Sequence, residues 1–183
     1  MTLPIASSPC VLDVAIVGCG PAGAVAAALL GQAGLRVHVC DRLPGVYEIP
    51  RAIALDHEVM RVFQQLGLVE HVRNDLGPYL AAAFAQLAEH PLVGQAETCG
   101  LMGALLLVKD KAKGTAFDAH LEVGMRCRAH CFTQGVIMRA VGDRMIIAPP
   151  LVITRAQVDE MVALIRRCLD LTLADAHAQG WMA

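Results

Sequence analysis

Apolar runs flank a glycine-rich turn in the first part of the chain. An apolar, β-branched run at residues 11–18 predicts a buried strand, and a second such run at 36–41 predicts another. The small apolar residues between them predict a helix, so the order is strand, glycine turn, helix, strand, as in a βαβ unit. A further helix is predicted from His57, with Asp56 as its N-cap and Gly67 as its end.

The second part of the chain has a different pattern. Residues 76–90 and 118–134 have the apolar spacing of helices. The glycine-rich apolar stretch at 92–108 predicts paired strands, and the charged stretch at 109–114 indicates a solvated turn. Residues 136–150 predict two short strands around a Gly-Asp turn.

The final helix, over residues 155–178, has the clearest start in the sequence. Thr154 and Gln157 have the spacing of a capping box, in which each side chain bonds the other residue's backbone N–H. Ile153 and Val158 are placed as the hydrophobic staple that accompanies such a start.

Composition and charge exclude several classes of protein. The chain has 183 residues, of which 56% are hydrophobic and 17% charged, against a usual value of about 25% charged. This excludes a disordered tail, and the net charge of -2 gives no reason to expect a nucleic-acid partner. No apolar run reaches the roughly 18 residues of a membrane span, and no secretory signal is apparent, so we expect a cytoplasmic protein.

Seven cysteines are spread along the chain without the spacing of a disulfide framework. We interpret them as small apolar side chains in a reducing compartment. Cys127, His130 and Cys131 would share one face of a helix and could begin a zinc site. A structural zinc site needs a fourth ligand, which no nearby residue supplies, so we expect no metal.

The glycine turn, GCGPAG at residues 18–23, is followed by Asp41 at the end of the second strand. In a dinucleotide site, Gly18 allows the tight turn, Gly20 lets the backbone approach a pyrophosphate, and Gly23 lets the helix pack closely on the strand. The helix N-terminus would then bind phosphate, and the Asp41 carboxylate would accept hydrogen bonds from ribose hydroxyls. The alternative is a glycine turn that serves packing alone.

Residues 11–75 resemble the N-terminal end of the flavin-dependent aromatic hydroxylases, especially the hydroxyphenylpropionate hydroxylase branch. The segment PRAIALDHE at 50–58 is the most specific part of this resemblance. The resemblance implies FAD, with Arg51 on its phosphate side, where a guanidinium suits phosphate oxygens; the alternative is a solvated surface arginine. The candidate cofactor-binding residues are Gly18, Cys19, Gly20, Pro21, Ala22, Gly23, Asp41, Arg42 and Arg51.

Residues 77–181 resemble the C-terminal domain of class III pyridoxal-phosphate (PLP) aminotransferases, of the omega-transaminase branch. The segment GVIMRAVGDRMIIAPPLVIT is specific to that branch. By this resemblance, Arg139 corresponds to the family's mobile arginine, which pairs with a substrate carboxylate. The alternative is a strand arginine whose head reaches water. Leu106 departs from the family, because an acidic residue is expected in that strand.

The predicted fold class is therefore α/β, in two pieces joined near residues 77–79. Residues 10–75 would form a truncated Rossmann-type βαβ unit that binds FAD, and residues 77–181 an α+β aminotransferase small domain. Each piece is expected to expose an apolar face that its family normally covers, which favours association of the chain with itself.

Neither resemblance extends to a complete active site. The hydroxylases need a later Gly-Asp motif for the ribityl chain, but the Gly142-Asp143 pair that follows residue 75 is the predicted turn within the segment that resembles the aminotransferases. The aminotransferases need a lysine that forms a Schiff base with PLP, and the only lysines, Lys109, Lys111 and Lys113, lie in the predicted turn. We therefore expect a fusion that binds FAD or another dinucleotide by its adenosine end at best and is inactive as a transaminase.

Two other interpretations remain open. The chain could be a working FAD-dependent oxidoreductase in which the aminotransferase-like half is a cap or dimerisation domain. It could instead be an interaction module that binds intact transaminase subunits.

Overall fold

The computed structural model describes residues 11–45 and 57–182, so Cys10, Arg51 and the predicted N-cap Asp56 lie outside the described residues. The chain divides into two compact units, Met1–Leu66 and Gly67–Ala183, called here the first and the second unit. Both units combine helices with strands, which confirms the predicted α/β class.

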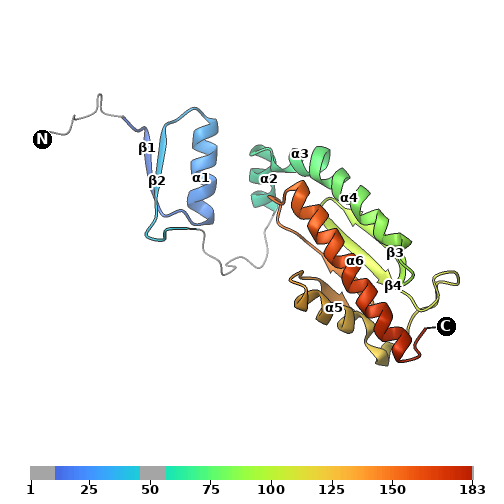
Figure 1. Cartoon of the computed structure of the whole chain (residues 1–183). Coiled ribbons are helices and arrows are strands. Elements are labelled where there is room, and N and C mark those ends of the chain that lie inside the picture. The colour runs from blue at the N-terminus through green and yellow to red at the C-terminus, as the bar shows by residue number, and fades with distance from the viewer. Residues whose placement is uncertain (1–10, 46–56, 183) are drawn as a thin grey trace, which may run out of the picture. The chain divides into compact units, whose positions relative to one another are not determined.

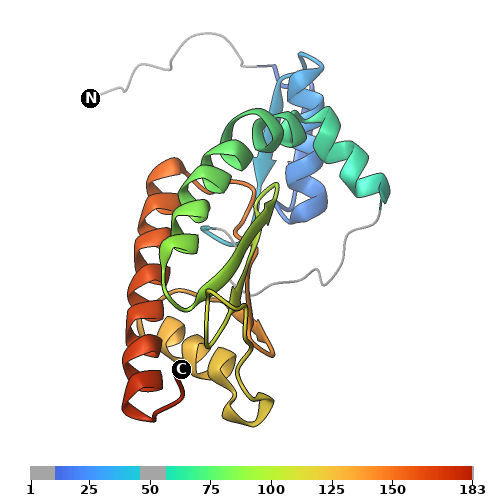
Figure 2. The same ribbon diagram turned by 90° about the vertical axis from the view of Figure 1, so that its right-hand side faces the viewer.

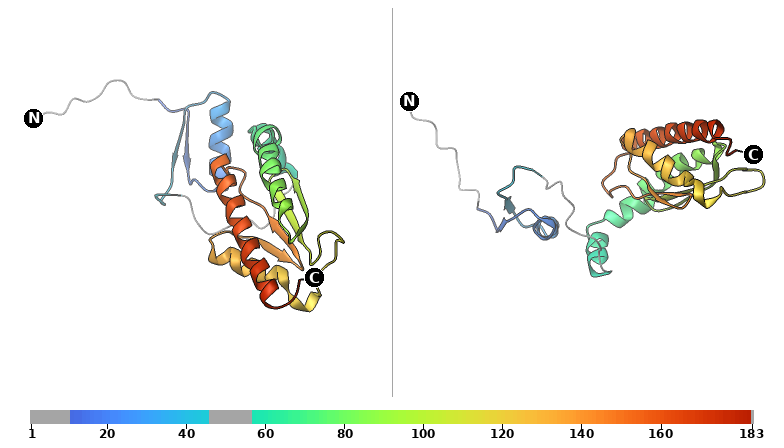
Figure 3. Two further views of the ribbon diagram at one scale, coloured as in Figure 1. Left: turned by 45° about the vertical axis from the view of Figure 1, so that its right-hand side comes forward. Right: turned by 90° about the horizontal axis from the view of Figure 1, so that it is seen from below.

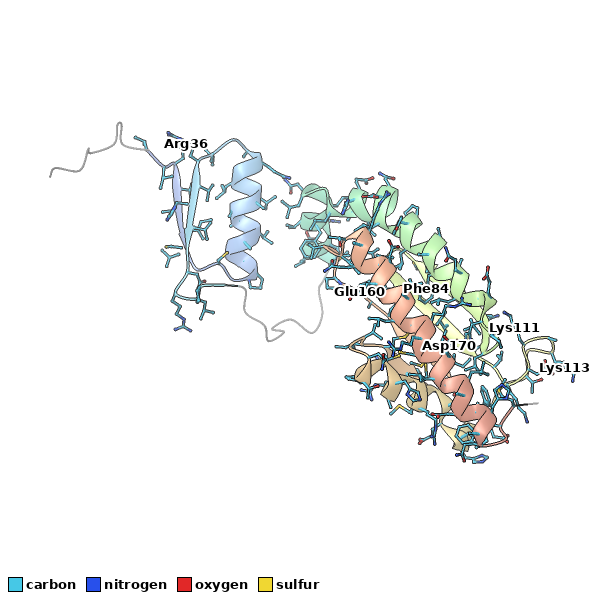
Figure 4. The ribbon with its side chains drawn as sticks, viewed as in Figure 1. Arg36, Phe84, Lys111, Lys113, Glu160 and Asp170 are labelled. Carbon is cyan, nitrogen blue, oxygen red and sulfur yellow. The ribbon has the colours of Figure 1, made fainter. Side chains whose placement is uncertain are left out.

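The first unit contains the predicted βαβ order (Figure 1). Strands β1 (Val14–Val17) and β2 (Val37–Cys40) are parallel, and helix α1 (Pro21–Gln32) connects them. Helix α2 (His57–Gln65) follows as expected. At the amino ends of the strands, Asp13 accepts hydrogen bonds from both the backbone and the guanidinium of Arg36, which ties β1 to β2 (Figure 4).

Only one face of this two-stranded sheet is covered in the first unit. Val14, Ile16, Val37 and Val39 are half-buried, and the residues that alternate with them are exposed. Val17 keeps 87% of its surface exposed. Because parallel strands are normally buried on both faces, the described part of the first unit has a helix-covered face but no closed core.

The second unit is built on an antiparallel sheet with the strand order β3-β4-β6-β5. Strands β3 (Val93–Cys99) and β4 (Met102–Leu107) form the first predicted pair, and β5 (Arg139–Val141) and β6 (Arg144–Ile147) form the second. The two hairpins join because β4 also pairs with β6. The long antiparallel sheet is visible beside the helices in Figure 2.

Three helices cover the same face of this sheet: α4 (Gly77–Ala85), α5 (Val123–Thr133) and α6 (Arg155–Ala178) (Figure 3). Their apolar residues meet alternate residues of the strands, and Phe84 and Leu105 are completely buried. Four short turns complete the unit: α3 (Leu68–His71), η1 (Val72–Leu76), η2 (Gln86–Glu89) and η3 (Ala119–Leu121).

Helix α6 begins as predicted. The Gln157 backbone N–H donates to Thr154 Oγ1 at 3.3 Å, and the Thr154 N–H donates to Gln157 Oε1 at 2.9 Å. Val158 is fully buried and Ile153 packs against the core. Local sequence is sufficient for this helix start because all four residues lie within six consecutive positions.

The helix predicted over 118–134 is interrupted. Glu122 adopts a left-handed conformation, with φ of 49°, and separates η3 from α5. The cause is a tertiary approach: a Cβ built on Gly124 would lie 2.0 Å from the carbonyl oxygen of Gly142. The Gly124 N–H also donates to Asp143 Oδ1 at 2.9 Å, so the β5–β6 turn determines where α5 begins.

A π-helical turn, η1, lies directly before the predicted join. The Gly77 N–H donates to the carbonyl oxygen of Val72, five positions earlier. A Cβ on Gly77 would lie only 2.5 Å from that oxygen, so glycine is required there. A π-turn accommodates one extra residue within a helix, and here it connects the end of the hydroxylase-like stretch to α4.

Candidate functional site

The glycine turn between β1 and α1 has the close packing that its sequence predicts. Gly18 has φ of 106°, a conformation that favours glycine, and its N–H donates to the Cys40 carbonyl at 2.7 Å. A Cβ built on Gly23 would lie 1.9 Å from the Gly18 carbonyl oxygen. The turn can therefore close only while residue 23 has no side chain.

Gly20 leaves the N-terminus of α1 accessible. It is the N-cap of the helix in an extended conformation, without a side chain that accepts from the first turn, and Pro21 follows it. A Cβ on Gly20 would meet no atom within 4 Å. Since Pro21 has no N–H, the first free donors of α1 are the amides of Ala22 and Gly23, in the positive end of the helix dipole.

The Asp41 carboxylate joins the ends of the two strands. It accepts from the Cys19 N–H at 2.6 Å through Oδ2 and from the Leu43 N–H at 2.9 Å through Oδ1. The bonds from Leu43 and then Cys19 hold the pKa of Asp41 below its usual value, so the group is ionised at neutral pH. Each carboxylate oxygen can accept one more hydrogen bond.

A cavity of about 350 Å³ lies at the carboxyl ends of the strands, lined by Val17, Gly18, Cys40, Asp41 and Arg42. In open α/β sheets, ligands bind at this edge. Cys40 was missed at the sequence level, although strand alternation places it on the same exposed face as Val17. Its thiol donates to the Ile16 carbonyl at 3.6 Å.

Arg139 lies in the second unit, on strand β5 and at the edge of the sheet. Its side chain is exposed, on the sheet face opposite the helices, and it forms no ion pair among the described residues. The guanidinium is therefore available to an anion.

The lysine-rich turn is more structured than the sequence indicates. Lys111 Nζ donates to the carbonyl oxygens of Ala88 and His90, and Lys113 Nζ lies 3.3 Å from Asp110 Oδ2 (Figure 4). The Lys111 bonds tie the turn to the end of η2, and the Lys113 contact lies within the turn.

The Cys127, His130 and Cys131 side chains do not converge on one point. The two thiols are buried in the core beside Cys168, whereas His130 Nε2 lies 2.8 Å from Asp175 Oδ2 on α6. Burial raises the pKa of Cys168, which keeps that thiol protonated. Within residues 11–45 and 57–182, no three His, Cys, Asp or Glu side chains could hold a metal ion, and no helix could span a membrane.

Comparison with known proteins finds both kinds of similarity along this chain, and the match to the flavin family extends beyond residue 75. The family described as FAD binding domain matches residues 11–134. The chain is also similar to a probable NADH-specific resorcinol 4-hydroxylase of Rhodococcus jostii, with 56% identity over 59 residues that cover 32% of this chain and 11% of that protein.

The other similarity is to aminotransferases. A putrescine–pyruvate aminotransferase of Pseudomonas aeruginosa is 48% identical over 125 residues, which cover 68% of this chain and 27% of that protein. The solved omega-transferase of Vibrio fluvialis JS17 superposes with a TM-score of 0.61 and 36% identity, covering 66% of this chain and 29% of that one. The chain thus spans little more than a quarter of the aminotransferases it matches, and the class III resemblance is confirmed.

Proposed function

The chain belongs to the FAD binding domain family, and from this premise we propose that its first unit binds FAD by the adenosine and pyrophosphate end. We further propose that the chain combines this unit with an aminotransferase-like domain and has no complete active site of either family. The observation that carries the proposal is the Asp41 carboxylate, which holds the Cys19 N–H at 2.6 Å beside the accessible N-terminus of α1.

The donors and acceptors of the turn suit the two parts of this ligand. The Ala22 and Gly23 amides can donate to pyrophosphate oxygens. These oxygens can approach the backbone because Gly20 has no side chain. The ionised Asp41 accepts from the ribose hydroxyls, and Arg42 lies at the same cavity. The role of Arg51 on the phosphate side is proposed from the resemblance alone.

The described residues suit the flavin ring less well than they suit the adenosine and pyrophosphate end of FAD. When bound, FAD supplies the redox chemistry of that ring, and hydroxylation needs a site that excludes water. No described residue of the first unit is buried, so the unit offers the ring no closed wall. We therefore propose binding without hydroxylation.

The residues also do not fit PLP. The chain has three lysines, all within the turn at 109–114, and this turn holds Lys111 and Lys113 on carbonyl and carboxylate oxygens. We propose no amino transfer by this chain. Arg139 then remains as an anion-binding side chain inherited with the fold. Ping-pong amino transfer by the pure chain, lost on Arg139→Ala, would contradict this.

Quenching of flavin fluorescence on titration of the full chain tests FAD binding. Gly20→Val is the informative variant, because the site has space for the side chain and a φ of -72° that valine can adopt, but the valine blocks the pyrophosphate. We expect saturable binding by the wild type, at least about tenfold weaker binding by Gly20→Val, and competition by ADP.

Gly31→Ala is the matched control, since Gly31 lies in α1 with nothing within 4 Å of its added Cβ. It should bind like the wild type. Circular dichroism checks that each variant is folded. Equal affinity of the wild type and Gly20→Val, or no binding by a folded wild type, would contradict the proposal.

A second candidate role is interaction, favoured by the 48% identity of the aminotransferase-like region to a complete enzyme. Its partners would be intact aminotransferase subunits or a second copy of the chain. Co-purification with a tagged aminotransferase subunit tests the first of these partners.

A further inference from the structure

One face of the sheet in the second unit is left open. Along β4, Leu105 and Leu107 are completely buried beneath the helices, whereas Ala104 and Leu106 between them remain partly exposed. Strand β6 alternates in the same way, and Figure 3 shows the helices together on the opposite side. The open face is therefore the side of the sheet that carries Ala104, Leu106 and their cross-strand neighbours.

The strand pairing forms a charged row across this face. Glu97 on β3 pairs with Ala104 on β4, Ala104 with Ile146 on β6, and Ile146 with Arg139 on β5. Residues directly opposite one another lie on the same face of a sheet. The row thus begins with an acid, continues with two apolar residues and ends with an arginine, about 14 Å away at the usual strand spacing.

The neighbouring row adds one apolar residue, Leu106, and a second arginine, Arg144, to the central strands of the face. Leu106 pairs with Gln95 on one side and Arg144 on the other, at the position where the aminotransferase resemblance leads us to expect an acid. Among the described residues, Glu97 is the one acid that the strands place on this face. No ion pair within the described ranges involves Glu97, Arg139 or Arg144.

We propose that two copies of the chain associate through this face, with Glu97 of each copy against Arg139 of the other. The two copies are related by a twofold axis that lies between the two sheets and runs parallel to the strands. This axis reverses the order of the row in the second copy relative to the first. Both acids then lie over arginines, and at the centre Ala104 of each copy faces Ile146 of the other. Such an interface is isologous, and the strands of the two sheets remain nearly aligned, as in β-sandwiches.

The size of the face determines how strong this association is. Four strands of up to seven residues span about 19 Å by about 23 Å at most, so each copy buries roughly 400 Å². That is about half of the area of a standard stable interface. The dimer should therefore form and dissociate with concentration in the micromolar range, and added salt should weaken it.

Sedimentation velocity of the full chain, from about 1 to about 100 μM, measures this equilibrium. The wild type should shift from monomer to dimer. Glu97→Arg and Arg139→Glu should each raise the dissociation constant at least about tenfold, because each substitution places like charges opposite one another at both of the Glu97–Arg139 contacts. An equimolar mixture of these two variants should restore the dimer, because every contact then joins opposite charges.

Glu160→Arg is the control, because Glu160 is exposed on the outer side of α6 (Figure 4); it should dimerise like the wild type. If a charge reversal unfolds the chain, the neutral Glu97→Gln and Arg139→Gln replace it and should weaken the dimer. A wild type that stays monomeric, variants that dimerise normally, or a mixture that fails to restore the dimer would each overturn the proposal. This interface does not depend on FAD binding.

Discussion

Arg155 donates from Nε to Asp75 Oδ1 at 3.1 Å, although the two residues are 80 positions apart. Asp75 ends the stretch that resembles the hydroxylases, and Arg155 is the first residue of α6. The Arg155 guanidinium also lies over the Tyr79 ring, 4.8 Å from its centroid, and the Tyr79 hydroxyl donates to Asp159 at 2.8 Å. The end of the hydroxylase-like stretch thus packs as part of the aminotransferase-like unit.

Asp75→Asn should loosen this junction without unfolding the unit. The pair is partly exposed, so it contributes little to global stability, but its loss frees the short helical turns before α4. We expect faster amide exchange over Leu68–Leu76 and an unchanged melting temperature, measured by hydrogen-exchange mass spectrometry and calorimetry. Glu89→Gln, at an exposed residue of η2, should leave both unchanged. A fall of several degrees in the melting temperature would contradict this.

Phe84→Ala should destabilise the second unit strongly. Phe84 is fully buried, and its ring packs where a Cβ on Gly103 would come within 3.0 Å. Such truncations leave a cavity and cost about 3–5 kcal/mol in the free energy of unfolding. Urea unfolding followed by fluorescence of Trp181, the single tryptophan, reports on this unit. Phe132→Ala, at a residue with 49% of its surface exposed, should cost far less.

Gly23→Ala should disrupt the first unit in a way that Gly20→Val does not. The added methyl group would lie 1.9 Å from the Gly18 carbonyl oxygen, so the β1–α1 turn must open. We expect loss of FAD binding together with faster amide exchange in α1, whereas Gly20→Val loses binding alone. Normal exchange and normal FAD affinity in Gly23→Ala would show that the turn closes differently.

The second unit should lose stability as the solution becomes acidic, through His90. This side chain is 2% exposed; its Nδ1 accepts from the Leu92 N–H at 3.2 Å, and its Nε2 lies 3.2 Å from Asp170 Oδ1. Burial lowers the pKa of His90 despite the nearby Asp170 carboxylate, with Arg166 and Lys111 acting in the same direction as burial.

The unfolded chain therefore takes up this proton first, so the free energy of unfolding should fall as pH drops below the ordinary histidine value of about 6.5. Urea titrations between neutral pH and pH 5 measure the slope. His90→Gln should flatten it, and His177→Gln, at an exposed histidine, should retain it. If the His90→Gln chain showed the same slope as the wild type, the pH dependence would belong to another group.

Much of the fold could be predicted from local sequence patterns. The capping box at Thr154 and Gln157 and the hairpin around Gly142 are determined within a few residues, and both appear as expected. The break at Glu122 could not be predicted, because it depends on the approach of Gly142 to Gly124. Likewise, the turn sequence indicates phosphate binding, but the bond between Asp41 and the Cys19 amide needs both strands in place.

The sequence by itself determined the two families, the order of helices and strands, and the residue types of the glycine turn, because each is recorded in short contiguous segments. The tertiary structure alone decided that residues 67–76 pack with the second unit, that Cys40 lines the cavity, and that Glu97 and Arg139 end one row of the open sheet face. These are relations between distant segments, and strand register and helix packing create them only when the chain folds.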